Sequence, residues 1–224
     1  MKSERLSRIV ANCDKIEVVA DIGCDHGLVC AELVRSGKAR KAIAVDISPG
    51  SLAKAERLAK ELGLEERIEC RLGDGLSVLE PGEAGGILAA GMGGPLLMRI
   101  LENGWKVARR AQYMVLCPQN YPDSLRQYLN EAGYEIVWEE IAREKKKFYP
   151  ILKVRLGRAR AYTPMELLVG RSGQRNEAWA EYVRHEIAVQ AQIQRQAAGG
   201  PAGQKALERI KLYEQALRES GRER

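Results

Sequence analysis

Short apolar runs rich in β-branched residues alternate along the first part of the chain with segments whose apolar positions recur every three or four residues. The first pattern predicts buried strands and the second predicts amphipathic helices. Strands are expected at 16–22, 41–46, 68–72, 85–90 and 112–116. Helices are expected over 3–13, between 27 and 37, over 52–62 with Ser48 and Pro49 opening that helix, and over 96–101 and 123–131. Regular alternation of the two predicts an α/β protein built on a doubly wound parallel sheet.

The pattern changes after residue 133. Two strand-like runs, 134–141 and 148–156, are separated only by residues 142–147. Parallel neighbours need a crossover of about a dozen residues, so these two strands should pair antiparallel. A parallel sheet that ends in an antiparallel hairpin is typical of Rossmann-like class I methyltransferases, whereas a dinucleotide-binding dehydrogenase continues with parallel strands.

The end of the chain predicts a small helical domain. Residues 175–198 and 204–220 have helical periodicity, and the glycine-rich segment 199–203 joins them. In the second helix Ala206, Ile210, Tyr213 and Leu217 follow the spacing of an antiparallel coiled-coil seam, with Leu207 outside it. We therefore expect a catalytic domain over 1–158 and a helical hairpin over 159–224. Dimerisation is an alternative role for this hairpin, although we expect a monomer.

Composition narrows the class of protein. The 224 residues carry 36 Lys and Arg against 30 Asp and Glu, and 29% of them are charged. No run approaches the roughly 18 apolar residues of a membrane span, and residues 1–8 lack the apolar core of a secretory signal. Five cysteines form no Cys-x-x-Cys pair and only two histidines accompany them. We expect a cytoplasmic protein that has no membrane span, no metal site and no disulfide framework.

Basic residues gather in one stretch. Between 143 and 160 there are eight Lys and Arg and a single acid, Glu144. An exposed basic run of this kind is either a solvated face or a surface for a polyanion such as RNA. The candidate RNA-binding residues are Arg143, Lys145, Lys146, Lys147, Arg158 and Arg160, together with Arg5 and Arg8 of the first helix.

The turn after the first strand, 21–27, has the sequence Asp-Ile-Gly-Cys-Asp-His-Gly. Its acidic-x-Gly-x-x-x-Gly spacing lacks the Gly-x-Gly-x-x-Gly pattern of dinucleotide sites. Asp21 and Asp25 would repel a pyrophosphate, but they can face the sulfonium and amino groups of S-adenosylmethionine. The charges of this loop therefore favour the methyl donor.

Two further acids follow the next strands. Asp46, with Ile47, ends the second strand, where a carboxylate can accept both ribose hydroxyls. Asp74, with Gly75, follows the third strand and can accept from the adenine amino group. Each acid alone is compatible with a helix cap or a turn. Three acids at three successive strand ends favour a cofactor site.

These residues, taken with Gly-Met-Gly-Gly (91–94), Leu-x-Pro (116–118), Lys-Phe-Tyr (147–149) and the helical tail, resemble the bacterial tRNA adenine-N1 methyltransferases that act on position 22. The resemblance spans nearly the whole chain. It implies S-adenosylmethionine as cofactor, tRNA as substrate and a C-terminal coiled coil that helps to hold the RNA. The chain departs from the family at 117–120, where Cys-Pro-Gln-Asn replaces Gln-Pro-Asn.

The resemblance also implies roles for individual residues. Adenine N1 carries a lone pair, so the site must align it with the methyl group rather than activate it. Asp25 is expected to accept from N6 or to stabilise the cationic product, while His26 shapes the pocket. The candidate catalytic residues are Asp25, His26, Gln119 and Tyr149, the last as a stacking surface for the base. The candidate cofactor-binding residues are Asp21, Gly23, Cys24, Gly27, Asp46, Ile47, Asp74, Gly75, Gly91, Met92 and Gly93.

Several alternatives remain open on the sequence. His26 is equally compatible with a loop histidine bonded to backbone, Tyr149 with a core residue, and 91–94 with a flexible turn. For the whole protein, the rivals are a methyltransferase for a small molecule or protein, and a non-catalytic RNA-binding protein on the same scaffold. A dehydrogenase is the weakest rival, because its glycine pattern is absent.

Overall fold

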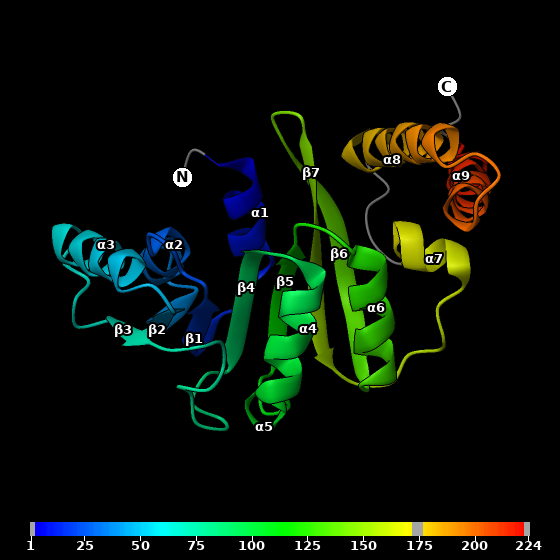
Figure 1. Cartoon of the computed structure of the whole chain (residues 1–224). Helices are drawn as coiled ribbons and strands as arrows, with labels where there is room; N and C mark the ends of the chain where they lie inside the picture. Colours follow the sequence, from blue (N-terminus) through cyan, green and yellow to red (C-terminus); the bar gives the residue numbers. More distant parts are fainter. Residues whose placement is uncertain (1–2, 172–176, 222–224) are drawn as a thin grey trace.

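The computed structural model describes residues 3–171 and 177–221, and in these residues seven strands form one sheet in the order β3-β2-β1-β4-β5-β7-β6 (Figure 1). The strands are β1 (Ile16–Ile22), β2 (Ala39–Asp46), β3 (Ile68–Leu72), β4 (Gly86–Met92), β5 (Tyr113–Pro118), β6 (Tyr134–Glu144) and β7 (Lys147–Leu156). Strands β1 to β5 run parallel, and β7 pairs antiparallel with both β5 and β6. The predicted parallel sheet with a terminal antiparallel hairpin is confirmed.

Helices cover both faces of this sheet (Figure 1). The helices of the sheet region are α1 (Glu4–Asn12), α2 (Leu28–Arg35), α3 (Pro49–Glu61), α4 (Gly94–Asn103), α5 (Trp105–Ala108) and α6 (Pro122–Glu131). Successive strand residues point to opposite faces, so Val19 packs in the core with α1, α2 and α3, while Ala20 packs in the core with α4 and α6. Both cores leave the carboxyl ends of the parallel strands uncovered for a site.

Local sequence explains where the helices begin. The Ser3 hydroxyl accepts from the backbone nitrogen of Leu6 at 3.3 Å and caps α1. The Ser48 hydroxyl accepts from Ser51 in the same way, and Pro49 supplies the fixed φ that suits a first helical residue. Helices α1 and α3 therefore begin where the sequence predicts.

The hairpin differs from its prediction. Residues 142–147 were expected to form the connection, but the strands continue until Glu144 pairs with Lys147. Only Lys145, in the left-handed region at φ 57, and Lys146 form the turn. The predicted loop was too long because the end of the hairpin extends past the edge of the sheet, where its side chains are polar although its backbone is paired. The hairpin consequently reaches above the carboxyl edge, beside α1 (Figure 1).

Three helices follow the sheet: α7 (Pro164–Val169), α8 (Glu177–Gln196) and α9 (Pro201–Glu219). The predicted start of α8 at residue 175 lies outside the described residues, and α9 begins at proline 201 rather than 204. In α9 Ala206, Tyr213 and Leu217 of the predicted seam are buried and Ile210 is half-buried, while Leu207 outside the seam is 45% exposed. Helices α5 and α7 were not predicted because each is too short to show a period.

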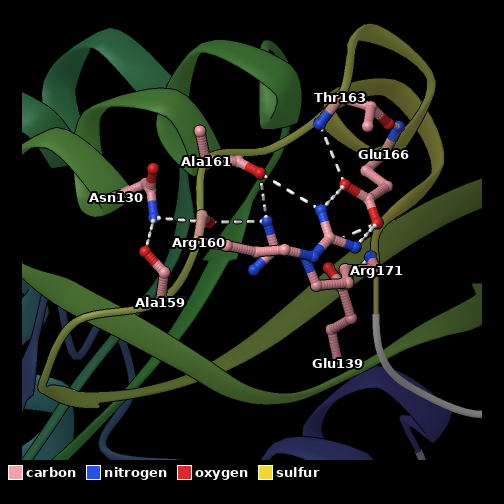
Figure 2. Close-up of polar contacts among 8 residues, drawn as sticks. All are labelled: Asn130, Glu139, Ala159, Arg160, Ala161, Thr163, Glu166 and Arg171. Atoms are coloured by element: carbon pink, nitrogen blue, oxygen red, sulfur yellow. Dashed lines mark hydrogen bonds and ion pairs between the residues drawn. The ribbon is translucent and has the colours of Figure 1, made fainter.

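Helix α7 and the connector before it are fixed to the sheet by polar contacts (Figure 2). Asn130 of α6 donates to the carbonyls of Ala159 and Arg160, and Glu139 of β6 accepts from the backbone nitrogen of Arg171 at 2.7 Å. Glu166 accepts from both Arg160 and Thr163. The connector is thus tied to α6 and β6, which sets the position of the helices that follow.

A buried ion pair lies beneath the same connector. Arg126 of α6 donates from Nε to Glu139 at 3.0 Å and from Nη1 to the carbonyl of Leu167 at 2.7 Å, and its side chain is 1% exposed. Beside it Trp179, Val183 and Tyr213 of α8 and α9 pack against Ile141 of β6. The C-terminal helices therefore share a core with the end of the sheet.

Candidate active site at the carboxyl edge of the sheet

The loops after β1, β4 and β5 meet at the carboxyl ends of the adjacent strands β1 and β4. The chain order of the sheet reverses between these two strands. Crevices at such a reversal are the usual ligand sites of open α/β sheets. A cavity of about 340 Å³ opens there. Its lining residues are Arg5, Leu6, Asp21, Gly23, Cys24, Asp25, His26, Leu28, Val29, Ala90, Gly91, Met92 and Gln119.

Asp21 forms the floor of this cavity. Its carboxylate is 5% exposed, and its hydrogen-bonding contact is the thiol of Cys30 at 3.8 Å. Burial, with a smaller contribution from the nearby charge of Asp46, raises the pKa of Asp21 to about 7. A buried carboxyl with this little compensation is the group that a cationic ligand would stabilise in its ionised form.

The loop that follows is tied to β2. Gly23 and Cys24 donate their backbone nitrogens to the carbonyl of Val45 at 2.8 and 3.1 Å. Asp25 lies in the left-handed region at φ 49, and its backbone nitrogen donates to the Asp46 carboxylate at 3.1 Å. These contacts hold the Asp25 side chain, which is 73% exposed, at the mouth of the cavity.

His26 contacts side chains rather than the backbone partner that the sequence left open. Its Nε2 lies 3.3 Å from the Lys54 ammonium and 3.4 Å from the Asp25 carboxylate. Nε2 can accept from Lys54 only when it carries no proton and can donate to Asp25 only when it does. The two contacts therefore exclude each other as hydrogen bonds, and the tautomer of the ring decides which of them forms.

The glycines of the loop serve different purposes. Gly27 has φ +68, and a Cβ there would lie 2.8 Å from the Cβ of Ala55, so this glycine allows α2 to pack on α3. A Cβ on Gly23 would instead lie 3.3 Å from the methyl carbon of Met92, across the cavity. Gly23 thus keeps the space beside Met92 open in the cavity, whereas Gly27 is required for the packing of α2 on α3.

The strand ends beyond this loop place the remaining candidate cofactor residues along the same edge. Asp46 accepts from the backbone of Asp25 and of Ser48, so one carboxylate both caps the turn and faces the site. Ile47 is 71% exposed, which is unusual for an isoleucine. Asp74 is exposed and Gly75 is buried against Ile100. These four lie outside the cavity wall and extend the site toward β3.

The loops after β4 and β5 brace one another. Gln119 donates its backbone nitrogen to the carbonyl of Met92 at 2.8 Å, and the side-chain oxygen of Asn120 accepts from the backbone of Gly94 at 3.2 Å. A Cβ on Gly93 would lie 2.8 Å from that same oxygen. Gln119 therefore faces the cavity while Asn120 holds the glycine loop, which separates the two amides that the sequence could not distinguish.

Burial also keeps the thiols of this region neutral. It raises the pKa of Cys117 to about 12 and that of Cys24 well above its usual range. Neither thiol can therefore act as a nucleophile near neutral pH. A site of carboxylates, an imidazole and amides, without an activated nucleophile, suits a reaction in which the acceptor attacks a bound electrophile directly.

Arg5, predicted as a phosphate contact of the first helix beside the active-site mouth, forms part of the cavity wall itself. Its guanidinium lines the cavity, lies 5.0 Å from the ring centroid of Tyr149 and approaches Glu144, with Nε 3.9 Å from the carboxylate. That Nε is buried and has no hydrogen-bond partner. Tyr149 itself is half-buried behind Arg5 and is not part of the cavity wall, so a direct stacking face for the base would need Arg5 to move.

Comparison with known proteins identifies this architecture. A family model described as a methyltransferase domain matches residues 2–152. The tRNA (adenine(22)-N(1))-methyltransferase of Bacillus subtilis strain 168 is 32% identical over 202 residues, which cover 85% of both chains. The chain belongs to this methyltransferase family.

Solved structures agree with that assignment. The structure of the B. subtilis M1A22 tRNA methyltransferase has a TM-score of 0.86 and 28% identity, covering 97% of this methyltransferase and 99% of that chain. A candidate tRNA (m1A22) methyltransferase of Streptococcus pneumoniae, solved in complex with S-adenosyl-L-methionine, has a TM-score of 0.88 and 28% identity and covers 97% and 100%. The sequence resemblance is therefore confirmed.

The methyltransferase does not unite its basic run into one surface, contrary to the prediction. Lys145, Lys146 and Lys147 are exposed at the hairpin end above the cavity edge. Arg158 and Arg160 follow the opposite end of β7, at the amino edge of the sheet, and Arg160 is held by Glu166. Because β7 runs antiparallel to β5, from the carboxyl edge to the amino edge of the sheet, the two ends of the basic run are separated by the length of β7.

Two other predicted RNA contacts are already engaged. Arg8 pairs with Glu4 at 2.8 Å and with Glu140 at 3.2 Å, and both carboxylates raise its pKa. Arg143 pairs with Glu181 of α8 at 2.6 Å. An RNA phosphate would have to compete with these carboxylates for either guanidinium.

In the residues that the structure describes, no cluster of three or more His, Cys, Asp or Glu side chains is arranged to hold a metal ion. All five cysteines are free thiols. No helix in that same part of the methyltransferase combines the length and apolar character needed to cross a bilayer.

Proposed function

We propose that this protein transfers the methyl group of S-adenosylmethionine to N1 of adenine 22 in tRNA. The observation that carries the proposal is the cavity at the strand reversal with the carboxylates Asp21 and Asp25 in its lining. It occurs in a chain that aligns over 85% of its length, at 32% identity, with a methyltransferase of that specificity. When bound, the cofactor supplies an electrophilic methyl group on a sulfonium. The buried carboxylate of Asp21 and the exposed apolar face of Ile47 fit such a cationic, partly apolar ligand.

The residues around the cavity then hold and orient the base. The N1 lone pair needs no general base, so alignment dominates the rate. Asp25, held at the cavity mouth, accepts a hydrogen bond from the N6 amino group and stabilises the positive charge that the base gains on methylation. Gln119, on the opposite wall, offers an amide that fixes the base in its plane. His26 sets the position of Asp25 through their mutual contact.

The RNA is expected to approach over the hairpin. Lys145, Lys146 and Lys147 present three ammonium groups above the cavity edge, and Arg5 stands inside it. We assign 1–158 as the catalytic part and 159–224 as the part that supports the tRNA. We further assign the protein to the cytoplasm, as a monomer.

The proposal is tested with labelled S-adenosylmethionine and unmodified tRNA transcripts, followed by digestion and mass spectrometry of the nucleosides. We expect 1-methyladenosine, and its loss when adenine 22 is replaced by guanine. Cofactor binding without methylation of any tRNA would contradict the tRNA assignment while leaving the methyltransferase class intact.

Two matched carboxylate variants test the assigned roles. Asp25→Asn should lower kcat by about 10²-fold, within the usual range for loss of a group that acts in the transition state, with little change in cofactor affinity. Asp74→Asn should weaken cofactor binding by about tenfold, the value of one hydrogen bond to a charged acceptor, with little change in kcat. Equal effects of both variants on kcat and on cofactor affinity would contradict this division.

A further inference from the structure

A second hollow lies beside the catalytic cavity, on the other side of the loop after β5. Its volume is about 250 Å³, and it is bounded by that loop, by β7 and by the C-terminal helices α8 and α9. Gln119 lines both this hollow and the catalytic cavity. The two spaces are therefore neighbours that share a wall, and nothing in the proposed methyl transfer uses the second.

Aromatic rings form much of the second hollow. Phe148, Tyr121, Tyr182 and Tyr213 line it, from β7, the loop after β5, α8 and α9. Phe148 lies against Tyr182 with the ring centroids 6.1 Å apart. Because successive strand residues point to opposite faces, Phe148 turns to the core of the C-terminal helices, whereas Tyr149 turns to α1 and Arg5. Phe148 therefore lines the second hollow, while Tyr149 lies on the other face of the strand behind Arg5.

Tyr121 is the most exposed of these rings. It is 58% exposed although it directly precedes α6, and its backbone is in the left-handed region at φ 50. Non-glycine residues occupy that region at a cost and do so mainly where surrounding structure or function requires it. The strained backbone leaves a large aromatic face at the rim of the hollow.

The polar groups of the hollow indicate what it can hold. Arg209 of α9 is paired with Asp123 of α6, so its charge is already compensated. Glu186 of α8 is half-buried, and burial raises its pKa. A phosphate would meet two carboxylates here and be repelled. A flat, uncharged ring with amino and carbonyl edges meets aromatic faces, acceptors and a donor, which is the chemistry of a nucleobase.

We propose that this second hollow binds the base of a nucleotide next to the target adenine in the tRNA chain. The proposal rests on the proposed function and adds a second base-binding site to it. An adenine that enters the catalytic cavity must leave its stack, and its neighbour loses a stacking partner at that moment. Rings of the second hollow replace that partner, with Tyr121 and Phe148 as stacking surfaces and Glu186 as an acceptor for an amino group.

The test is a double-mutant cycle between protein and RNA. The protein carries Tyr121→Ala, and the tRNA carries an abasic residue at position 21 or 23, on either side of the target. The measured quantity is the KM for tRNA, with cofactor affinity and thermal stability of each variant as checks. Trp105→Ala is the matched control, because Trp105 is 52% exposed on α5 at the far edge of the sheet.

The expected result is non-additive. Tyr121→Ala should raise the KM for intact tRNA by about tenfold, as loss of one stacked base does, with cofactor affinity unchanged. One of the two abasic tRNAs should show the same increase with wild-type protein and no further increase with Tyr121→Ala. Trp105→Ala should leave both abasic effects at their wild-type size. Glu186→Gln, which keeps shape and removes the charge, should give a smaller increase that the same abasic position abolishes.

Two different failures are distinguishable. If wild-type protein methylates adenine 22 but the effects of Tyr121→Ala and of both abasic residues simply add, the second base-binding site is overturned and the methyl transfer stands. If wild-type protein does not methylate tRNA at all, the proposed function falls and the second site falls with it.

Discussion

The guanidinium of Arg5 lies 5.0 Å from the ring centroid of Tyr149, which joins the first helix to the last strand above the catalytic cavity. Arg5→Lys keeps the charge but loses the planar group that stacks on the ring. We expect kcat for tRNA methylation to fall by about fivefold to thirtyfold, the value of a partly buried cation–π contact, with cofactor affinity unchanged. Arg8→Lys, on the same helix but outside the cavity wall, is the control. Equal losses in the two variants would show that Arg5 has no special role.

The raised pKa of Asp21 predicts how cofactor binding depends on pH. The ionised carboxylate should bind the cationic cofactor better than the neutral acid. Affinity should therefore increase from pH 5.5 to 7.0, toward the Asp21 pKa of about 7, while the cofactor amino group stays charged over that range. Titration calorimetry would measure it, with Asp21→Asn expected to bind weakly and without this trend. A flat profile in wild-type protein would contradict the role of Asp21.

The raised pKa of Asp21 also predicts that the stability of the protein decreases with rising pH, whereas cofactor affinity increases. The pKa of this carboxyl is about 7 in the folded protein and about 3.9 in an unfolded chain, so the folded state holds more protons between these values. The contribution of Asp21 to the free energy of unfolding is then greatest below pH 4 and is lost as the pH rises to about 7. Urea unfolding at pH 5 and 7.5 should show a smaller decrease in Asp21→Asn than in wild type. Equal decreases would place the titration elsewhere.

Two glycines with matching backbone separate strain from packing. Gly27 and Gly37 have φ of +68 and +71, but a Cβ meets Ala55 at 2.8 Å only at Gly27, with nothing within 4 Å at Gly37. Gly37→Ala should reduce the free energy of unfolding by about 1–2 kcal/mol through backbone strain. Gly27→Ala should cost about 1–3 kcal/mol more, because α2 must move from α3. Equal losses in urea unfolding would show that the contact is easily relieved.

The buried pair Arg126–Glu139 is expected to matter far more than an exposed one. Arg126→Met leaves the buried Glu139 carboxylate with only the backbone nitrogen of Arg171 as a donor and removes the side-chain donor of the Leu167 carbonyl. It should cost about 3–5 kcal/mol of unfolding free energy. Arg40→Met, which breaks the pair with Glu17 at the surface, should cost less than about 1 kcal/mol. Adding Glu139→Gln to Arg126→Met should recover part of the loss. No recovery would indicate that the carbonyl contact, not the charge, carries the effect.

Separating the basic run by position tests the RNA surface. Replacing Lys145, Lys146 and Lys147 by Ser should weaken tRNA binding and reduce the salt dependence of log K by about one per lost phosphate contact. Replacing Arg158 and Arg160 by Ser should change neither, because they lie at the opposite edge of the sheet. Binding titrations between about 50 and 200 mM salt would measure both the tRNA affinity and its salt dependence. Equal losses would mean that tRNA wraps around both edges.

Much of the secondary structure of this protein follows from the local pattern of apolar and polar residues. Apolar runs and helical spacing locate β1 to β5 and their helices, because each element buries a face whose period is written in consecutive residues. The placement of Asp21, Asp46 and Asp74 at strand ends is predicted equally well, since the carboxyl ends of parallel strands share one edge of the sheet. The exceptions are α5 and α7, which are shorter than the period that would reveal them.

Contacts between distant segments depend on how the elements pack, and the pattern says nothing about them. Arg5 is predicted from sequence only as a phosphate contact of the first helix, yet the hairpin brings Tyr149 and Glu144 to it and makes it part of the cavity wall. Residues 143–160 read as one basic surface, yet β7 carries their ends to opposite edges. The second hollow exists only where the loop after β5 meets α8 and α9. Side-chain neighbours far apart in sequence depend on the docking of whole elements, and that docking is a property of the packed core rather than of any segment's period.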